Sequence, residues 1–270
     1  MSVLPVPGAR LYYETVGSGP LLVMVPGATG TAEGMRRAGE LLARSYTVVL
    51  YDRRGFSRSR LDRPQDFAHR LDADADDLRR LAEHLSDAPA RIFGVSSGAT
   101  VALHTLARHP IVVGTLIAFE PPAMRLLPDG QRWLDFFHTV YDLYRRAGIE
   151  AAVQKFREET FAPGDRIAMA RAMDLTHGPI SANLAYWFDH ELRQYPAATL
   201  DLDRLRARAD RIVPAAGRDS HGYPCRDAAV ELGKRLGRPV IDLPGGHVGC
   251  MTQPAAFTTE LGQALTSRAA

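Results

Sequence analysis

Apolar runs of strand length alternate with longer segments of helical periodicity along the first part of the chain. The runs with the length and composition of strands are 10–16, 21–25, 46–51, 91–95 and 112–119. The helical segments between them are 32–43, 71–85 and 98–108. This alternation predicts an α/β fold with a mostly parallel central sheet flanked by helices. The turn-forming segment 17–20, Gly-Ser-Gly-Pro, predicts a hairpin between the first two strands.

The alternation stops after Pro121 and Pro122. Only helical segments follow, at 132–146, 149–159, 167–173 and 183–194. Strand-like runs return at 211–216 and 240–243, with helices at 226–236 and 254–266. Because a strand–helix series needs one continuous sheet to bury both faces, we expect one core of residues 1–122 and 209–270, interrupted by a helical cap, or lid, of residues 123–208. Length alone, 270 residues at about 150 per domain, would instead suggest two domains side by side.

Charge and hydropathy exclude several classes of protein. The chain has 33 Lys and Arg against 31 Asp and Glu, a net charge of +2, and the two signs are interspersed, so we expect no nucleic-acid partner. No apolar run approaches the roughly 18 residues that a membrane span needs, and the N-terminus lacks the pattern of a signal peptide. We therefore expect a cytoplasmic protein with no membrane partner.

The reactive residue types are few. The two cysteines, Cys225 and Cys250, provide neither a disulfide framework nor a cysteine-based zinc site, so we expect no metal, and we expect no cofactor. Only two lysines are present, Lys155 and Lys234, and neither lies in a motif for Schiff-base or phosphate chemistry. A catalytic amine is therefore not expected.

A candidate nucleophile lies where a predicted strand meets a predicted helix. Residues 94–98 read Gly-Val-Ser-Ser-Gly, with Ser96 at the centre. On such a corner the glycines permit a tight turn that holds the serine hydroxyl at the carboxyl edge of the sheet. The alternative is a plain serine N-cap of the following helix. We predict that Ser96 is a nucleophile.

A serine nucleophile needs a base. Of the nine histidines, His247 alone lies in a glycine-rich loop directly after the last predicted strand, in the segment Pro-Gly-Gly-His-Val-Gly. A flexible loop at that edge can present an imidazole to the serine, and we predict that His247 is the general base. The alternative is a loop histidine without a role.

The base needs an orienting acid, and two carboxylates qualify. Asp219 follows the predicted strand 211–216, in chain order between serine and histidine, and is the preferred candidate. Its alternative role is a turn-forming aspartate. Glu120, directly after the strand that ends at Phe119, is the second candidate for the acid.

An acyl-transfer site also needs donors for a developing oxyanion. We predict the backbone N–H of Ser97, at the start of the helix after the nucleophile. The second predicted donor is the N–H of Ala28, in the Pro-Gly-Ala-Thr-Gly loop after strand 21–25. The alternative for that loop is a turn without a function.

At these residues the chain resembles the α/β-hydrolase superfamily, in its cap-bearing group of small esterases, lactonases, carbon–carbon bond hydrolases and cofactor-free haloperoxidases. The resemblance rests on six motifs in order: RLYYETVGSGP, VPGATG, VVLYDRRGFSRS, GVSSGA, GRDS and PGGHVG. It implies the α/β-hydrolase fold with an inserted helical cap, and a serine, acid and histidine acting together.

Three departures from that family pattern affect what the resemblance implies. Pro26 stands where many relatives have histidine before the glycine of the oxyanion loop. At the acid position the carboxylate of Asp219 arrives one residue earlier than is common, which keeps Glu120 as the alternative. Haloalkane dehalogenases and epoxide hydrolases carry an aspartate where this chain has Ser96, and this disfavours both activities.

The predicted cap is the part that indicates a substrate. Its aromatic residues recur at helical spacing, and we expect four of them to line a mostly apolar pocket: Trp133, Phe137, Tyr141 and Trp187. The alternative is packing of the cap helices against the core and against each other. We expect a small-molecule substrate, a largely hydrophobic ester or lactone. Carbon–carbon hydrolysis, perhydrolase or haloperoxidase chemistry, processing of a biosynthetic intermediate and non-catalytic ligand binding stay open, as does a homodimer.

Overall fold

The computed structural model describes residues 2–176 and 178–266. Its described residues form a nine-stranded sheet in the order β1-β2-β4-β3-β6-β7-β8-β9, with β5 pairing β2. The strands are β1 Ser2–Val6, β2 Ala9–Val16, β3 Leu21–Val25, β4 Thr47–Tyr51, β5 Arg60–Leu61, β6 Ala90–Val95, β7 Val113–Phe119, β8 Ile212–Gly217 and β9 Ile241–Leu243. From β4 to β9 in this order neighbouring strands run parallel, and the pairs that involve β2 are antiparallel. The predicted mostly parallel sheet is confirmed.

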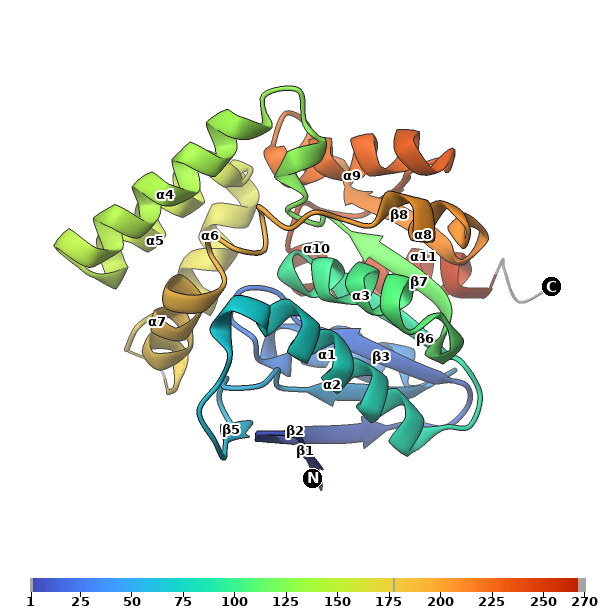
Figure 1. Ribbon diagram of the computed structural model, residues 1–270. Coiled ribbons are helices and arrows are strands. Elements are labelled where there is room, and N and C mark those ends of the chain that lie inside the picture. Colours follow the sequence, from blue (N-terminus) through green and yellow to red (C-terminus); the bar gives the residue numbers. More distant parts are fainter. Residues whose placement is uncertain (1, 177, 267–270) are drawn as a thin grey trace.

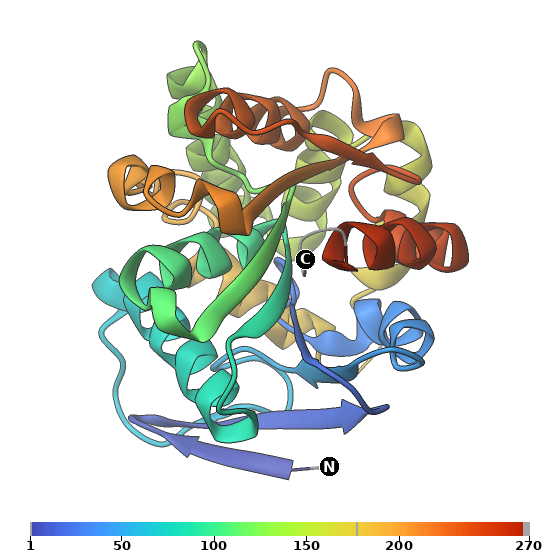
Figure 2. The ribbon, with the colours of Figure 1, turned by 90° about the vertical axis from the view of Figure 1, so that its right-hand side faces the viewer.

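Helices cover both faces of the sheet, as Figure 2 shows with α1 and α11 on one side and α2 and α3 on the other. These helices are α1 Arg36–Leu42, α2 Arg70–Leu85, α3 Ser97–Arg108, α9 Pro224–Leu236, α10 Gly249–Thr252 and α11 Pro254–Thr266. Alternation along β3 explains the two layers: Val23 and Val25 belong to the apolar cluster under α2 and α3, whereas Leu22 and Met24 belong to the cluster under α1 and α11. Because β3 is buried on both faces, its sequence is a continuous apolar run and not an alternation of apolar and polar residues.

At the N-terminal edge of the sheet, one prediction is wrong and one strand was not predicted. The predicted hairpin between β2 and β3 does not form, because β4 lies between them and its first residue, Thr47, donates hydrogen bonds to the carbonyls of Gly19 and Pro20. Strand β1 was not predicted, because Pro5 within it and Pro7 just after it are typical of a loop. An edge strand tolerates proline, since only one of its sides needs hydrogen-bond donors.

Between β7 and β8 the described residues form helices and no strand. The helices of this part, which we call the β7–β8 segment (residues 120–211), are α4 Gly130–Ala147, α5 Ile149–Thr160, α6 Pro163–Ala172, α7 Ile180–His190 and α8 Leu202–Arg206. Figure 1 shows α4 to α7 grouped together beside the sheet. The division into a core and a cap stays a prediction, and residues 1, 177 and 267–270 of those two predicted parts lie outside the described residues.

No helix in the described part of the chain combines the length and the apolar composition that crossing a bilayer requires.

Candidate active site

Ser96 occupies a strained corner between β6 and α3. Its backbone has φ 55° and ψ −124°, a region that non-glycine residues rarely adopt. The amide of Ser96 donates a 2.9 Å hydrogen bond to the carbonyl of Phe119, the last residue of β7. A Cβ atom at Gly98 would lie 2.2 Å from the carbonyl oxygen of Val25, so the helix after the corner approaches β3 as closely as only glycine permits. The corner holds the serine side chain at the carboxyl edge of the sheet.

His247 and Glu120 form a buried pair next to this corner. The imidazole Nδ1 of His247 lies 2.6 Å from Oε2 of Glu120, and their side chains are 5% and 1% exposed. The other oxygen, Oε1, accepts a 2.8 Å hydrogen bond from the amide of Gly217, at the end of β8. Because an ionised carboxylate only accepts hydrogen bonds, Nδ1 carries the hydrogen and Nε2 is left as the free acceptor.

The prediction that Asp219 orients His247 is wrong in this structure. Strand β8 ends at Gly217, and the next three residues form a short 3-10 turn that leaves Asp219 exposed. Its amide donates to the carbonyl of Gly245, and no described residue hydrogen-bonds to its carboxylate. The alternative carboxylate, Glu120, contacts the histidine instead. It does so from a backbone with positive φ, 46°, which turns its side chain back toward β8.

Both predicted oxyanion donors lie around Ser96. Ser97 begins α3, so its amide belongs to the unpaired N-terminal turn, where the helix dipole favours negative charge. Ala28 lines the same pocket as Ser96, and a Cβ at the preceding Gly27 would lie only 3.1 Å from the Cβ of Ser96. Among the described residues, neither the Ala28 amide nor the Ser97 amide donates a hydrogen bond. Both are therefore free to bind a ligand oxygen.

A buried arginine donates hydrogen bonds to the backbone of the loop that carries Ala28. Arg53, fully buried, donates to the carbonyls of Pro26 and Gly27 at 3.1 and 2.9 Å. The same guanidinium binds Glu191 in the β7–β8 segment through two hydrogen bonds of 2.9 and 2.7 Å. The sequence offered no signal for this contact, because 138 residues separate its partners.

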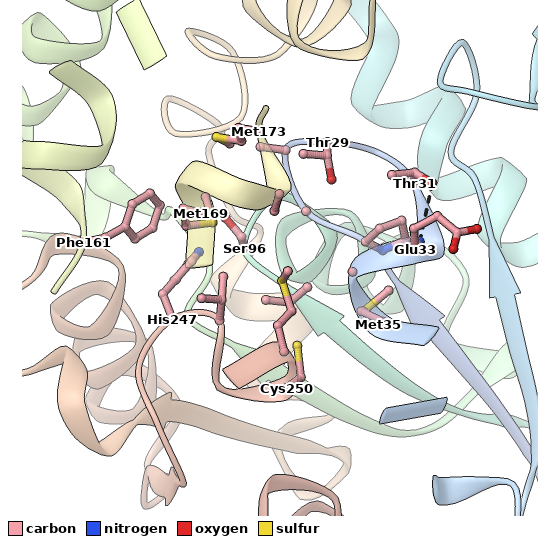
Figure 3. Close-up of a pocket in the computed structure, with 18 of the residues that line it drawn as sticks. Thr29, Thr31, Glu33, Met35, Ser96, Phe161, Met169, Met173, His247 and Cys250 are labelled. Carbon is pink, nitrogen blue, oxygen red and sulfur yellow. Dashed lines mark hydrogen bonds between the residues drawn. The ribbon is translucent and has the colours of Figure 1, made fainter. Parts of the chain in front are cut away.

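A pocket of about 300 Å³ opens at Ser96 and His247 (Figure 3). Its wall is mainly thioether and hydrocarbon, contributed by Met35, Phe156, Phe161, Met169, Met173, Ile180 and Met251. No arginine or lysine is among its described lining residues. Burial raises the pKa of Cys250, which also lines it, to about 12, which excludes a thiolate there at neutral pH. The pocket suits a neutral, largely apolar ligand.

The four aromatic residues predicted to line the pocket do not line it. Phe137 and Trp187 are buried against Phe156, with ring centroids 6.3 and 5.1 Å apart. Trp133 packs edge-on against a neighbouring ring of α4, and Tyr141 lies under the guanidinium of an arginine. The aromatic stripe is thus the packing surface between the helices, as the alternative interpretation held. The lining residues Met169, on α6, and Met173, directly after its end, were missed, although their four-residue spacing is that of one helix face.

Asp165, in the first turn of α6, was also missed. This carboxylate is 3% exposed and accepts hydrogen bonds from the backbone amides of His247, at 2.8 Å, and Val248, at 3.3 Å. Burial raises its pKa above the usual range, whereas the charge of His247 and the two amides lower it. In the sequence it resembles an ordinary acid at a helix N-terminus.

The described residues contain no group of three or more His, Cys, Asp or Glu side chains arranged to hold a metal ion.

Comparisons with known proteins agree with this fold. The family model described as "alpha/beta hydrolase fold" matches residues 20–243. An uncharacterized hydrolase of Bacillus subtilis, YraK, is 32% identical over 265 residues, 96% of this chain and 93% of that protein. Two solved structures share the fold: a thermophilic esterase from Thermogutta terrifontis (TM-score 0.75, 21% identity, 99% and 97% of the two chains covered) and the enol-lactonase from Burkholderia xenovorans (0.74, 18%, 98% and 100%).

Proposed function

The chain belongs to the α/β-hydrolase family, and from this membership and the geometry around Ser96 we propose that it is a serine hydrolase of small to medium, largely hydrophobic carboxylic esters or lactones. The observation that carries the proposal is the 2.6 Å contact between Nδ1 of His247 and Glu120, beside a pocket that Ser96 and His247 both line. That contact leaves Nε2 as the base on the pocket side.

In the acylation step of this proposal, Oγ of Ser96 attacks the ester carbonyl carbon and its proton passes to Nε2 of His247. The carbonyl oxygen becomes an oxyanion, which the amides of Ala28 and Ser97 bind. The carbon–oxygen bond to the alcohol then breaks, and the leaving oxygen takes the proton from His247. Glu120 stabilises the imidazolium that exists between these two transfers.

Deacylation repeats the same transfers with water. A water molecule gives a proton to Nε2 of His247 as its oxygen attacks the acyl carbon. The bond between that carbon and Oγ breaks, the carboxylic acid leaves, and Oγ recovers the proton. For a lactone the alcohol released in the first step remains joined to the acyl group, so the product is one hydroxy acid.

The pocket supports a neutral hydrophobic substrate. Its described lining has no arginine or lysine to pair with a substrate carboxylate, and its methionines adapt to apolar groups of irregular shape. The β7–β8 segment contributes part of this wall, including Phe156, Met169 and Ile180, and we propose that it acts as the cap over the site. Similarity in fold to an esterase and an enol-lactonase agrees with this class of reaction.

A substrate panel tests the proposal. Wild type should hydrolyse p-nitrophenyl esters and simple lactones, and Ser96→Ala should lower kcat/KM at least about 10⁴-fold. The exposed Ser45→Ala variant is the matched control and should match wild type. A folded wild type without ester or lactone turnover contradicts the proposed substrate class. Carbon–carbon hydrolysis or perhydrolysis would then be assayed as the alternative reactions of the same residues.

A further inference from the structure

The carboxylate of Asp165 is buried without a cationic side chain as partner. Among the described residues, its hydrogen-bond donors are the backbone amides of His247 and Val248. The contact is close: a Cβ at Gly246 would lie 2.1 Å from Oδ2 of Asp165. Both donors are N–H groups, which bind more strongly to the ionised form of a carboxyl than to the protonated form. Burial raises the pKa of Asp165, and the charge of His247 and the two amides lower it. The structure thus places a buried carboxyl against the loop that carries the base, with donors that favour its ionised form.

We propose that Asp165 is a positioning residue for the hydrolase reaction, a second carboxylate that fixes the backbone of His247 and stabilises the imidazolium formed during proton transfer. This inference rests on the proposed function, because it concerns the same base. It assigns to the β7–β8 segment a part in the proton transfer itself, beyond covering the pocket.

The charges around His247 support this role. Glu120 faces the imidazole at Nδ1, and Asp165 faces the backbone of the same residue from α6. The other titratable group against Asp165 is the thiol of Cys250, which burial keeps neutral. Among the described residues, an imidazolium at this place therefore has two carboxylates and no cation beside it. Within a buried site such interactions are strong, because little water screens them.

Helix α6 also links this charge to the substrate. Met169 of the same helix and Met173, directly after its last residue, line the pocket, and Asp165 lies in its first turn. One short helix therefore contacts both the histidine loop and the pocket.

A purely structural tether would have a different effect. If Asp165 only holds the loop in place, neutral replacements that keep an acceptor for the amides slow turnover without changing the pH at which His247 loses its proton. If its charge acts on the imidazolium, the same replacements move that pH downward, because the protonated form is less stable without the nearby carboxylate.

The test is an NMR titration of the His247 imidazole together with the pH profile of kcat/KM. The variants are Asp165→Asn and Asp165→Ser; serine is the smaller and tolerates the close contact with Gly246 if asparagine does not. Asp219→Asn is the matched control, since Asp219 bonds the same loop at Gly245 through its backbone but leaves its carboxylate exposed. His247→Gln assigns the NMR signal.

We expect both Asp165 variants to shift the midpoint of the imidazole titration and the acid limb of the profile to lower pH by about 1 unit, and to lower the plateau kcat about tenfold with little change in KM. The control should show neither change. Folded variants whose midpoint stays at the wild-type pH overturn the inference. Because the NMR titration needs no substrate, a shifted midpoint in a protein without hydrolase activity would uphold Asp165 and contradict the proposed function instead.

Discussion

Two buried carboxylates of the β7–β8 segment contact residues outside it, and their surroundings differ. Glu191, just after α7, is fully buried between the guanidinium groups of Arg53 and Arg70, at 2.7 Å from each. Asp165, at the start of α6, accepts hydrogen bonds from two backbone amides, and among the described residues the charge that lowers its pKa is that of His247. The first carboxylate is neutralised whatever happens at the active site. The second has an electrostatic partner only when His247 is protonated.

This difference implies that the two contacts have different roles, one structural and one electrostatic. The Glu191 cluster fixes geometry, because Arg53 also holds the carbonyls of the loop that carries Ala28. The Asp165 contact responds to charge, because it adjoins the group that gains and loses a proton. Substitutions at the first should act mainly on stability, and substitutions around His247 should act mainly on turnover and its pH dependence.

The largest effect should come from the carboxylate that touches the imidazole directly. Glu120→Gln removes the charge opposite Nδ1 and offers an amide that favours the wrong tautomer of His247, so kcat should fall about 10³- to 10⁴-fold while the melting temperature changes little. Steady-state rates on a p-nitrophenyl ester measure the loss. Asp219→Asn should stay within a few-fold of wild type, and the reverse pattern would restore Asp219 as the acid.

The next effect should be on folding. Glu191→Gln leaves the buried Arg53 and Arg70 with one shared carboxylate, Asp74, in place of two, which should cost about 3–5 kcal/mol and lower the melting temperature by about 10 °C. Thermal unfolding followed by circular dichroism measures it. The exposed Glu150→Gln on α5 is the control and should change nothing. A folded Glu191→Gln as stable as wild type would mean that the cluster does not anchor the segment.

Substrate choice should depend on α6 rather than on the aromatic stripe of α4. Replacing Met169 and Met173 together with alanine enlarges the pocket, so kcat/KM for long acyl esters should rise relative to short ones by about tenfold. A chain-length series of p-nitrophenyl esters measures the ratio. Trp133→Phe, which lies outside the lining, should leave that ratio unchanged. A larger change from Trp133 than from the methionines would contradict the described lining.

The smallest effect should come from a carboxylate nearer the surface. Hydrogen bonds from Arg36 lower the pKa of Glu14 to about 2. Since the folded pKa lies below the ordinary value of about 4.5, this stabilisation is present above pH 4.5 and is lost as the pH falls toward 2. Glu14→Gln should therefore cost less than about 1 kcal/mol at pH 7, with a difference that narrows below pH 4.5 in urea unfolding. A constant difference would contradict this origin.

Local motifs explain how much of the molecule the sequence predicts. Ser96 and His247 line one pocket, as the sequence predicts, because each lies in a glycine-rich turn after a buried strand and parallel strands bring such turns to one edge. The choice between Asp219 and Glu120 was missed because it depends on one residue of offset at the end of β8 and on the positive φ of Glu120. Neither is visible in a pattern of residue types.

The contacts made by the β7–β8 segment were beyond prediction for another reason. Several helices of this segment carry an apolar face, so only the packing of α4 and α7 against α5 decides that the aromatic residues are covered, while Met169 and Met173 line the pocket. Asp165 and Glu191 meet partners 82 and 138 residues away in the chain. Sequence periodicity reports on neighbours within a few turns and carries no information on such pairings.

The central claim is that Ser96 is the activated nucleophile of this pocket. Intact-protein and peptide mass spectrometry after exposure to a fluorophosphonate tests it directly, because the reagent is attacked by an activated serine and leaves a stable adduct. The account predicts one adduct on wild type, located on the peptide that contains Ser96, and none on Ser96→Ala. A folded wild type that stays unmodified, or an adduct on another residue, would contradict it.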